Sequence, residues 1–295
     1  MTKPQRAYRT TEVPVRGGSL RVGIWGPDDA PPLVAIHGIT ANHLAWQLVA
    51  DQLTDLRIIA PDLRGRGRSC TLPGPWGMAQ HADDLAQVVA HLGLGSTPVV
   101  GHSMGGFAAL ALAEHSPDLV RSLLLLDGGL PFVVGVEADP DALVEATLGP
   151  ALARLTMTFD DATAYHDFWR GHPALGDSWG PELEAYTDYD LVGTAPHLHS
   201  AVSGDAVRAD SHDQFVRVVD DSVLRRLDRS MTMITVPAGL LGQPPGLYPD
   251  DVMAHWESVL PQLRVERWSD FNHYTMIMSA RGAAAVAVAV GSVIS

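Results

Sequence analysis

Short apolar runs alternate with amphipathic segments over the first 130 residues of the chain and again after residue 230. The runs have the length and composition of strands buried in a parallel sheet. They lie at 12–15, 20–24, 33–36, 57–60, 97–100, 120–126, 231–236 and 263–266. Apolar side chains repeat on one helical face at 79–92, and further helices are expected near 43–53, 106–115, 250–260 and 283–295. This alternation predicts an α/β fold with a doubly wound, mostly parallel sheet.

The alternation stops at Pro131 and resumes just after Arg229. The intervening segment has helix-like stretches and most of the acid: 18 Asp and Glu against 7 Arg, a balance of −11, whereas the rest of the chain carries −3. An insert between two strands of a regular sheet is expected to cover the carboxyl edge, where ligands bind in open α/β folds. We therefore predict a core formed by 1–130 and 230–295 and a mainly helical cap at 131–229.

Composition narrows the class of protein. Hydrophobic residues make up 46% of the 295 residues, which is enough for a large buried core. The formal net charge of −14 argues against nucleic acid and an anionic membrane surface as partners. Cys70 is the only cysteine, so no internal disulfide forms, and we expect it to be a small buried apolar residue. No apolar leader opens the sequence, which favours a cytoplasmic protein. Nothing in the sequence indicates the oligomeric state.

The segment Gly101-His102-Ser103-Met104-Gly105 follows an apolar strand and precedes a helix. A G-x-S-x-G pattern in this context is a nucleophile elbow, a turn so tight that only small residues fit on either side of the serine. The serine hydroxyl then points out of the sheet at a helix N-terminus, whose dipole favours developing negative charge.

Four motifs in this order resemble those of the α/β-hydrolase family over almost the whole chain. They are His37-Gly38 after the third strand, the D-x-x-G-x-G-x-S turn from Asp62 to Ser69, the elbow at Ser103, and Asn272-His273-Tyr274 near the C-terminus. The resemblance implies an esterase-like hydrolase with a serine nucleophile and a cap. Epoxide hydrolases and haloalkane dehalogenases of this fold use an aspartate at the elbow, so Ser103 argues against both.

A serine hydroxyl needs an adjacent base, and histidine suits neutral pH. Among 13 histidines, His273 is preferred because it follows the last strand, in the Ser…His order of this fold. His102 and His37 are expected to support the turn and the oxyanion loop. The backbone N–H groups of Met104 and Ile39 are the candidates for the oxyanion hole.

The acid that orients the histidine is harder to assign. The family usually places it just after the strand at 231–241, but the loop 241–247 there holds no carboxylate. Asp127 ends the preceding strand and is preferred; its alternative role is to stabilise the turn into the insert. Asp250 or Asp251 would be the next choice, although both also fit as charges at a helix N-terminus. Asp270, or a dyad without an acid, remains open.

Other candidates are weaker. Trp169 and Trp179, with Tyr186 and Tyr189, would line a substrate pocket or form the core of the insert. His197 and His199 could bind a metal, but without a further ligand cluster we interpret them as solvated loop residues. No metal and no cofactor are expected.

The preferred function is hydrolysis of a neutral or apolar carboxylic ester through an acyl-enzyme intermediate, with a small molecule as substrate. The acidic insert disfavours anionic substrates. The same residues could cleave an amide, a lactone or a carbon–carbon bond beside a carbonyl. A non-catalytic ligand-binding protein on this scaffold is the alternative from another class. The sequence does not identify the substrate.

Overall fold

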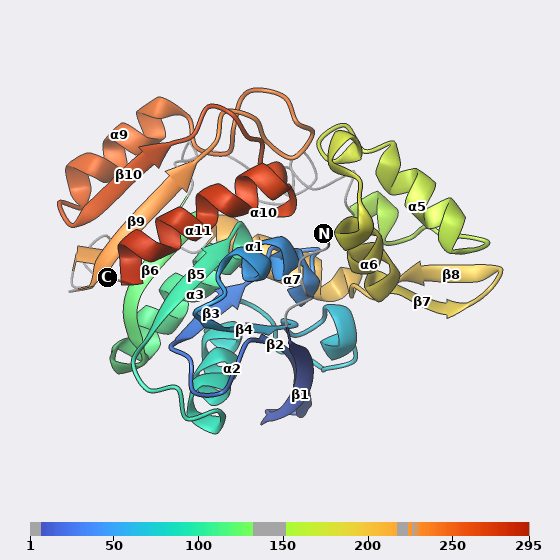
Figure 1. Ribbon diagram of the computed structural model, residues 1–295, viewed down its shortest axis with the longest axis horizontal. Helices are drawn as coiled ribbons and strands as arrows, with labels where there is room; N and C mark the ends of the chain where they lie inside the picture. Colours follow the sequence, from blue (N-terminus) through green and yellow to red (C-terminus); the bar gives the residue numbers. More distant parts are fainter. Residues whose placement is uncertain (1–6, 132–151, 217–223, 226, 228, 295) are drawn as a thin grey trace.

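A computed structural model describes residues 7–131, 152–216, 224–225, 227 and 229–294 of the chain. The main sheet has eight strands in the order β1-β2-β4-β3-β5-β6-β9-β10 (Figure 1). The β1–β2 and β2–β4 pairs are antiparallel, and all pairs from β4 to β10 are parallel. The strands are β1 (Tyr8–Val15), β2 (Gly18–Trp25), β3 (Pro32–Ile36), β4 (Arg57–Pro61), β5 (Thr97–His102), β6 (Val120–Leu126), β9 (Ser230–Thr235) and β10 (Leu263–Arg267).

Helices cover both faces of this sheet (Figure 1). One face packs against α2 (Met78–His91), α3 (Met104–His115) and α9 (Asp250–Val259). The other packs against α1 (Gln47–Gln52), α10 (Thr275–Met278) and α11 (Ala280–Ile294). Short 3-10 turns complete the core; they are η1 (His43–Trp46), η2 (Gly67–Ser69) and η3 (Pro117–Leu119).

Strand β6 shows why an apolar run becomes a central strand. Successive side chains of a strand point to opposite faces of the sheet. Leu123 and Leu125 lie in the core beneath α2 and α3, whereas Leu124 and Leu126 lie in the core beneath α1 and α11. A strand that is buried on both faces needs an uninterrupted apolar sequence. The predicted α/β fold with a doubly wound sheet is confirmed.

The insert follows β6 and precedes β9 in the sequence. Its described part contains α5 (Ala162–Arg170), η4 (Gly176–Ser178), α6 (Pro181–Asp190), α7 (Gly204–Val216) and a two-stranded sheet of β7 (Leu191–Thr194) and β8 (His197–Ser200). Helices α5 and α6 and strands β7 and β8 lie to one side of the main sheet (Figure 1). The predicted cap at 131–229 also includes 132–151, 217–223, 226 and 228, which lie outside the described residues. Its exact boundaries stay a prediction.

Three details differ from the sequence-based expectations. The β7–β8 hairpin was not expected, and His197 and His199 lie on strand β8 instead of in a loop. The segment expected as one helix at 43–53 begins as a 3-10 turn and continues as α1. Cys70 is free and only partly buried, not enclosed in the core.

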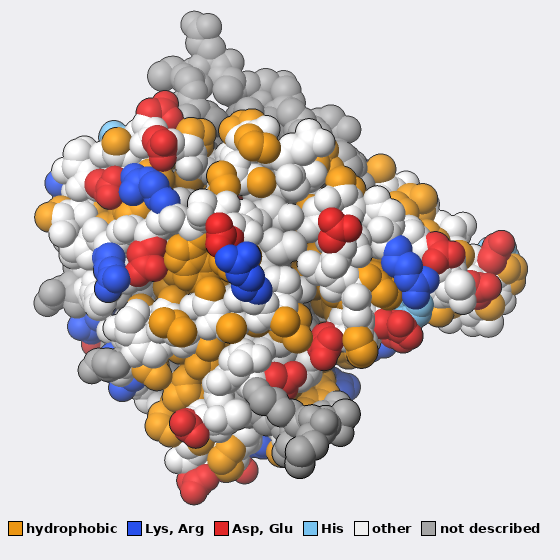
Figure 2. Space-filling model, turned by 45° about the horizontal axis from the view of Figure 1, so that its top comes forward, with side chains coloured by type: hydrophobic (Ala, Val, Ile, Leu, Met, Phe, Trp, Pro, Cys, Tyr) orange, Lys and Arg blue, Asp and Glu red, His pale blue; other side chains and the backbone are white. Residues whose placement is uncertain are grey.

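On the face drawn in Figure 2, acidic and basic side chains lie interspersed and form no continuous basic area. No helix among the described residues is long and apolar enough to cross a membrane.

Candidate active site

Ser103 lies at the turn between β5 and α3 with φ 56° and ψ −127°. A positive φ is uncommon for a residue with a side chain, and such outliers persist only where the surroundings hold them in place. Here the Ser103 N–H donates to the Leu126 carbonyl at 2.9 Å, and the Ser103 carbonyl accepts from the Gly106 N–H at 2.9 Å. The turn therefore has the conformation expected of a nucleophile elbow.

The glycines around Ser103 are required by close backbone approaches. A Cβ atom on Gly101 would lie 2.2 Å from the Gly105 carbonyl oxygen, and one on Gly105 would lie 2.1 Å from the Ile36 carbonyl oxygen. Helix α3 can pack this closely on β3 and β5 only without side chains at these two positions. The same packing places the first turn of α3 directly beneath the serine.

His273 and Asp127 form a buried pair. His273 Nδ1 lies 2.7 Å from Asp127 Oδ2, and the two side chains are 2% and 0% exposed. Asp127 lies just past β6 with φ 46°, and its N–H donates to the Ile234 carbonyl at 2.8 Å. Since the Asp127 carboxylate accepts at Nδ1, the Nδ1 atom of His273 carries the proton and its Nε2 is left as an acceptor.

The main chain of His273 is also held on both sides. Its N–H donates to the Ala238 carbonyl at 2.9 Å, and its carbonyl accepts from His102 Nε2 at 2.7 Å. Burial, with the nearby His273 ring, lowers the pKa of His102 well below its usual value, so His102 stays neutral. His102 thus supports the loop that carries His273.

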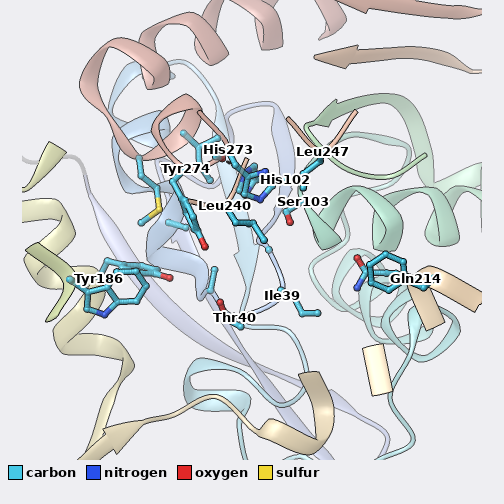
Figure 3. A pocket seen from close by; sticks show the side chains of 17 residues that line it. Ile39, Thr40, His102, Ser103, Tyr186, Gln214, Leu240, Leu247, His273 and Tyr274 are labelled. Atoms are coloured by element: carbon cyan, nitrogen blue, oxygen red, sulfur yellow. Dashed lines mark hydrogen bonds between the residues drawn. The ribbon is translucent and has the colours of Figure 1, made fainter. Parts of the chain in front are cut away.

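Ser103 and His273 line the same pocket (Figure 3). Neither the Ser103 hydroxyl nor His273 Nε2 has a hydrogen-bond partner among the described residues. Hydrogen bonds between a nucleophile and its base are often long before substrate is bound. Both groups are therefore available to a ligand in this pocket.

Two backbone N–H groups next to Ser103 are without acceptors among the described residues: those of Ile39 and Met104. Met104 begins α3, where first-turn amides have no partner within the helix. Gly38, which precedes Ile39, approaches Ser103 so closely that a Cβ atom on it would lie 3.6 Å from Ser103 Oγ. The arrangement presents two free donors beside one hydroxyl.

His37 holds the loop after β3. Its ring lies between the Leu63 N–H, which donates to Nε2 at 2.9 Å, and the Gly38 carbonyl, which lies 2.8 Å from Nδ1. Burial lowers the pKa of His37 to about 4, although the Asp62 carboxylate acts in the opposite direction. His37 is therefore a neutral structural support in this loop.

The pocket is mostly apolar. It encloses about 790 Å³, open solvent at its mouth included. Carbon-rich side chains from the core and from the insert line most of it; they are Ile39, Ala41, Ala45, Trp169, Phe215, Leu240, Leu247, Ile277 and Met278. Tyr186 lies on α6, whereas Thr40 and Tyr274 lie in the loops after β3 and before α10. Their hydroxyl oxygens point toward the same part of the pocket, and Gln214 lies across from them (Figure 3).

The structure separates the two tryptophans suggested for the pocket. Trp169 lines it, but Trp179 packs against His166 and under the Arg170 guanidinium, away from the lining residues. Tyr186 lines the pocket, and Tyr189 donates instead to Asp62 Oδ2 at 2.6 Å.

The competing acids lie elsewhere. Asp250 and Asp251 occupy the first turn of α9, and both are exposed. Asp250 pairs with Arg267 at 3.3 Å, and Asp270 pairs with Arg281 at the surface. Of the carboxylates considered, the structure brings only Asp127 to His273. Among the described residues, no group of three or more His, Cys, Asp or Glu could hold a metal ion.

Several lining residues were not anticipated from the sequence. Thr40 follows the oxyanion candidate Ile39 and Tyr274 follows His273, so their positions next to motif residues were an available signal. Gln214, Leu240 and Met278 have no such signal, because they reach the pocket only through the tertiary arrangement of the insert and the last loops.

Comparison with known proteins places the chain in a family. Residues 31–186, more than half of the chain, match the α/β hydrolase fold family. The chain belongs to this family, which confirms the resemblance noted in the sequence. Solved structures of other proteins share its fold at low identity. The crystal structure of E-2-(acetamidomethylene)succinate hydrolase covers 98% of this chain and 99% of its own, with a TM-score of 0.80 and 21% identity.

Curated relatives are similar over shorter stretches. Lipase LipV of Mycobacterium tuberculosis is 40% identical over 108 residues, which are 37% of this chain and 41% of that protein. The bifunctional esterase/perhydrolase DCH of Acinetobacter calcoaceticus is 36% identical over 122 residues, 40% of this chain and 44% of that protein. The chain thus spans less than half of the length of these two relatives.

Proposed function

We propose that the protein hydrolyses a neutral carboxylic ester through an acyl-enzyme intermediate on Ser103. Ser103 Oγ attacks the carbonyl carbon while its proton moves to His273 Nε2, and the N–H groups of Ile39 and Met104 hold the oxyanion. Collapse of the tetrahedral intermediate breaks the ester bond, and His273 returns the proton to the leaving alcohol. His273 then deprotonates a water that attacks the acyl group, which releases the acid and restores Ser103.

The buried His273–Asp127 pair is the observation that carries this proposal. The 2.7 Å contact fixes the tautomer in which Nε2 accepts a proton. When His273 becomes positively charged, the Asp127 carboxylate stabilises the imidazolium. A ligand-binding protein would not need an acid buried against this histidine, so the pair favours an enzyme over the non-catalytic alternative. The names of the relatives LipV and DCH, a lipase and an esterase, agree with the ester assignment.

The chemistry of the pocket supports a neutral substrate. Its lining contains no Asp, Glu, Lys or Arg. Two buried arginines touch lining residues, and both are already paired. Arg154 reaches the Thr40 carbonyl at 3.5 Å and pairs with Asp190 at 2.8 Å. Arg66 reaches the Ile39 carbonyl at 2.8 Å and pairs with Asp210. A carboxylate in this pocket would lose its hydration without gaining an unpaired cation. The succinate hydrolase shares the fold of this chain at 21% identity. We therefore do not assign its substrate to this protein.

A substrate screen with wild-type protein and Ser103→Ala tests the proposal. The panel contains p-nitrophenyl esters, matched anilides and lactones of graded chain length. We expect the wild type to turn over the esters fastest and Ser103→Ala to lose almost all of this activity. Faster turnover of anilides or lactones than of esters would replace the ester assignment, and turnover that is equal in both proteins would remove Ser103 from the mechanism.

A further inference from the structure

Arg66 is a fully buried arginine in the turn after β4, and its guanidinium contacts both residues whose amides flank Ser103. Its Nε donates to the Ile39 carbonyl at 2.8 Å. Its Nη2 lies 3.7 Å from Met104 Sδ, and its Nη1 donates to the Arg64 carbonyl at 2.8 Å. All three nitrogens of the group are thus engaged, and they connect the turn after β4 to the loop after β3 and to the start of α3.

These contacts determine how the Ile39 N–H is oriented. The Gly38 carbonyl accepts from the Ala41 N–H at 3.2 Å and lies 2.8 Å from His37 Nδ1. Since the carbonyl and N–H of a trans peptide point in opposite directions, these bonds aim the Ile39 N–H the other way. Arg66 holds the next peptide through the Ile39 carbonyl. The loop is fixed at two successive peptides, one held by His37 and one by Arg66.

Arg66 is itself anchored to the insert. Its Nη1 is hydrogen-bonded to Asp210 Oδ2, and Asp210 lies on α7 with no exposed surface. Asp210 also accepts from the Gly77 N–H at 2.6 Å and pairs with His81 Nε2 at 3.0 Å. Burial alone would raise the pKa of Asp210, but the Arg66 and His81 charges and these hydrogen bonds lower it, so it stays ionised.

The same helix carries Gln214 and Phe215 to the pocket. Helix α7 therefore touches the substrate space at its C-terminal end and the guanidinium of Arg66 one turn earlier. A displacement of α7 would move both the pocket wall and the anchor of the Ile39 loop.

We propose that Arg66 is a positioning residue that couples helix α7 of the insert to the oxyanion loop, so that the Ile39 N–H is correctly aimed only while α7 is docked. This proposal rests on the proposed function, since it assigns the Ile39 amide to the oxyanion hole. Arg66 does not reach the substrate; it acts through the Ile39 peptide and the Met104 side chain.

Arg64 provides a matched control. It lies two residues away, is equally buried, and binds one acid, Asp84, through two 2.8 Å hydrogen bonds. Its other side-chain bonds run to the Pro73 and Arg16 carbonyls at 2.8 Å, away from the pocket. Loss of either guanidinium removes a comparable buried network, but only Arg66 holds the Ile39 loop.

The experiment compares Arg66→Lys with Arg64→Lys, because lysine keeps the charge and cannot reproduce the planar fork. Four quantities are measured: kcat and KM for the best ester, the affinity for a trifluoromethyl ketone that forms an oxyanion on the serine, and the melting temperature. We expect Arg66→Lys to lower kcat and ketone affinity about tenfold or more with KM within about twofold, since one oxyanion donor contributes about 10²- to 10³-fold. Arg64→Lys should lower the melting temperature similarly and change kcat less than about twofold.

Equal effects of the two variants on kcat, or an unchanged ketone affinity in Arg66→Lys, would overturn the coupling. If a lysine variant does not fold, Asp210→Asn and Asp84→Asn give the same comparison with smaller changes, and only the first should lower kcat. A wild type that does not bind the ketone contradicts the proposed function itself. A wild type that binds the ketone, together with an Arg66→Lys variant that binds it equally well, contradicts only the role of Arg66.

Discussion

The carboxylate of Asp127 lies 2.7 Å from Nδ1 of His273, across 146 positions of sequence. Asp127 follows β6, and His273 follows β10, so the pair joins the ends of two strands that are separated by β9. The loop after β9, where the family usually keeps its acid, lies between them in the sheet order, and its Ala238 carbonyl accepts from the His273 N–H at 2.9 Å. Asp127, one strand nearer to Ser103, occupies the position on the imidazole that the proposed mechanism requires.

Asp127→Asn tests this assignment. We expect kcat/KM for an ester to fall by roughly 10²- to 10⁴-fold, because an amide at this position no longer fixes the tautomer or stabilises the imidazolium. Asp251→Asn is the matched control and should remain within about twofold of the wild type, since Asp251 is an exposed helix residue. Loss of activity in Asp251→Asn alone would reject Asp127 as the acid.

The hydroxyl groups of Tyr186, Tyr274 and Thr40 give the apolar pocket one polar region, and none has a hydrogen-bond partner among the described residues. An ester with a hydroxyl or ketone group that reaches them should be preferred over a plain ester of equal length. Tyr186→Phe should reduce this preference about three- to tenfold, the effect of one hydrogen bond. The plain ester serves as control, and an equal loss for both esters would contradict a binding role of the phenol.

The neutral, buried His37 predicts that stability decreases toward acidic pH. The unfolded chain takes up a proton on this histidine near pH 6.5, whereas the folded protein, with a pKa of about 4, does not. Below the unfolded pKa, protonation therefore favours unfolding. His37 alone should remove about 2 kcal/mol of unfolding free energy between about pH 7.5 and about pH 5, and His102 acts in the same direction.

Urea unfolding at these two pH values measures this loss. His37→Gln, which has no titrating group at this position, should show a smaller decrease between the two pH values than the wild type. An identical decrease in both proteins would assign the acid sensitivity to other groups.

Gly105 tests the packing that produces the elbow. A methyl group on it would meet the Ile36 carbonyl oxygen at 2.1 Å, so Gly105→Ala should lower the free energy of unfolding by about 1–3 kcal/mol or more, or displace α3 and abolish activity. Gly291→Ala is the control, because it lies in α11 with nothing within 4 Å of the added carbon. That variant should change stability by less than about 1 kcal/mol, in the stabilising direction. Thermal unfolding that is unchanged in Gly105→Ala would contradict the close packing.

Local patterns in the sequence were sufficient to predict the strands of the sheet and the nucleophile elbow. The apolar run at 120–126 predicts a central strand, because a strand that is buried on both faces of a sheet needs apolar side chains on both. Gly101 and Gly105 predict the tight turn at Ser103. Asp127 could be predicted for the same reason, because it follows a strand that the local sequence identifies. The match of residues 31–186 to the α/β hydrolase fold family supports the interpretation of these motifs.

The remaining features depend on contacts between distant segments. The β7–β8 hairpin turns at Ala195 and Pro196, and its glycine, Gly193, lies within β7 and not at the turn. Leu198 also bridges to Phe159 outside the hairpin. Arg66 meets Asp210 across 144 positions, and no local pattern pairs these two charges. The contribution of Gln214 to the pocket likewise cannot be predicted from the sequence, because it depends on how α7 packs against the core.

Covalent labelling of the serine tests the central claim most directly. The protein is treated with a fluorophosphonate, and the intact mass, the modified peptide and the remaining ester turnover are measured. The account predicts one phosphonyl group on Ser103 of the wild type, turnover lost in proportion to labelling, and no label on Ser103→Ala. A wild type that stays unlabelled while it hydrolyses esters, or a Ser103→Ala variant that turns over esters as fast as the wild type, would contradict it.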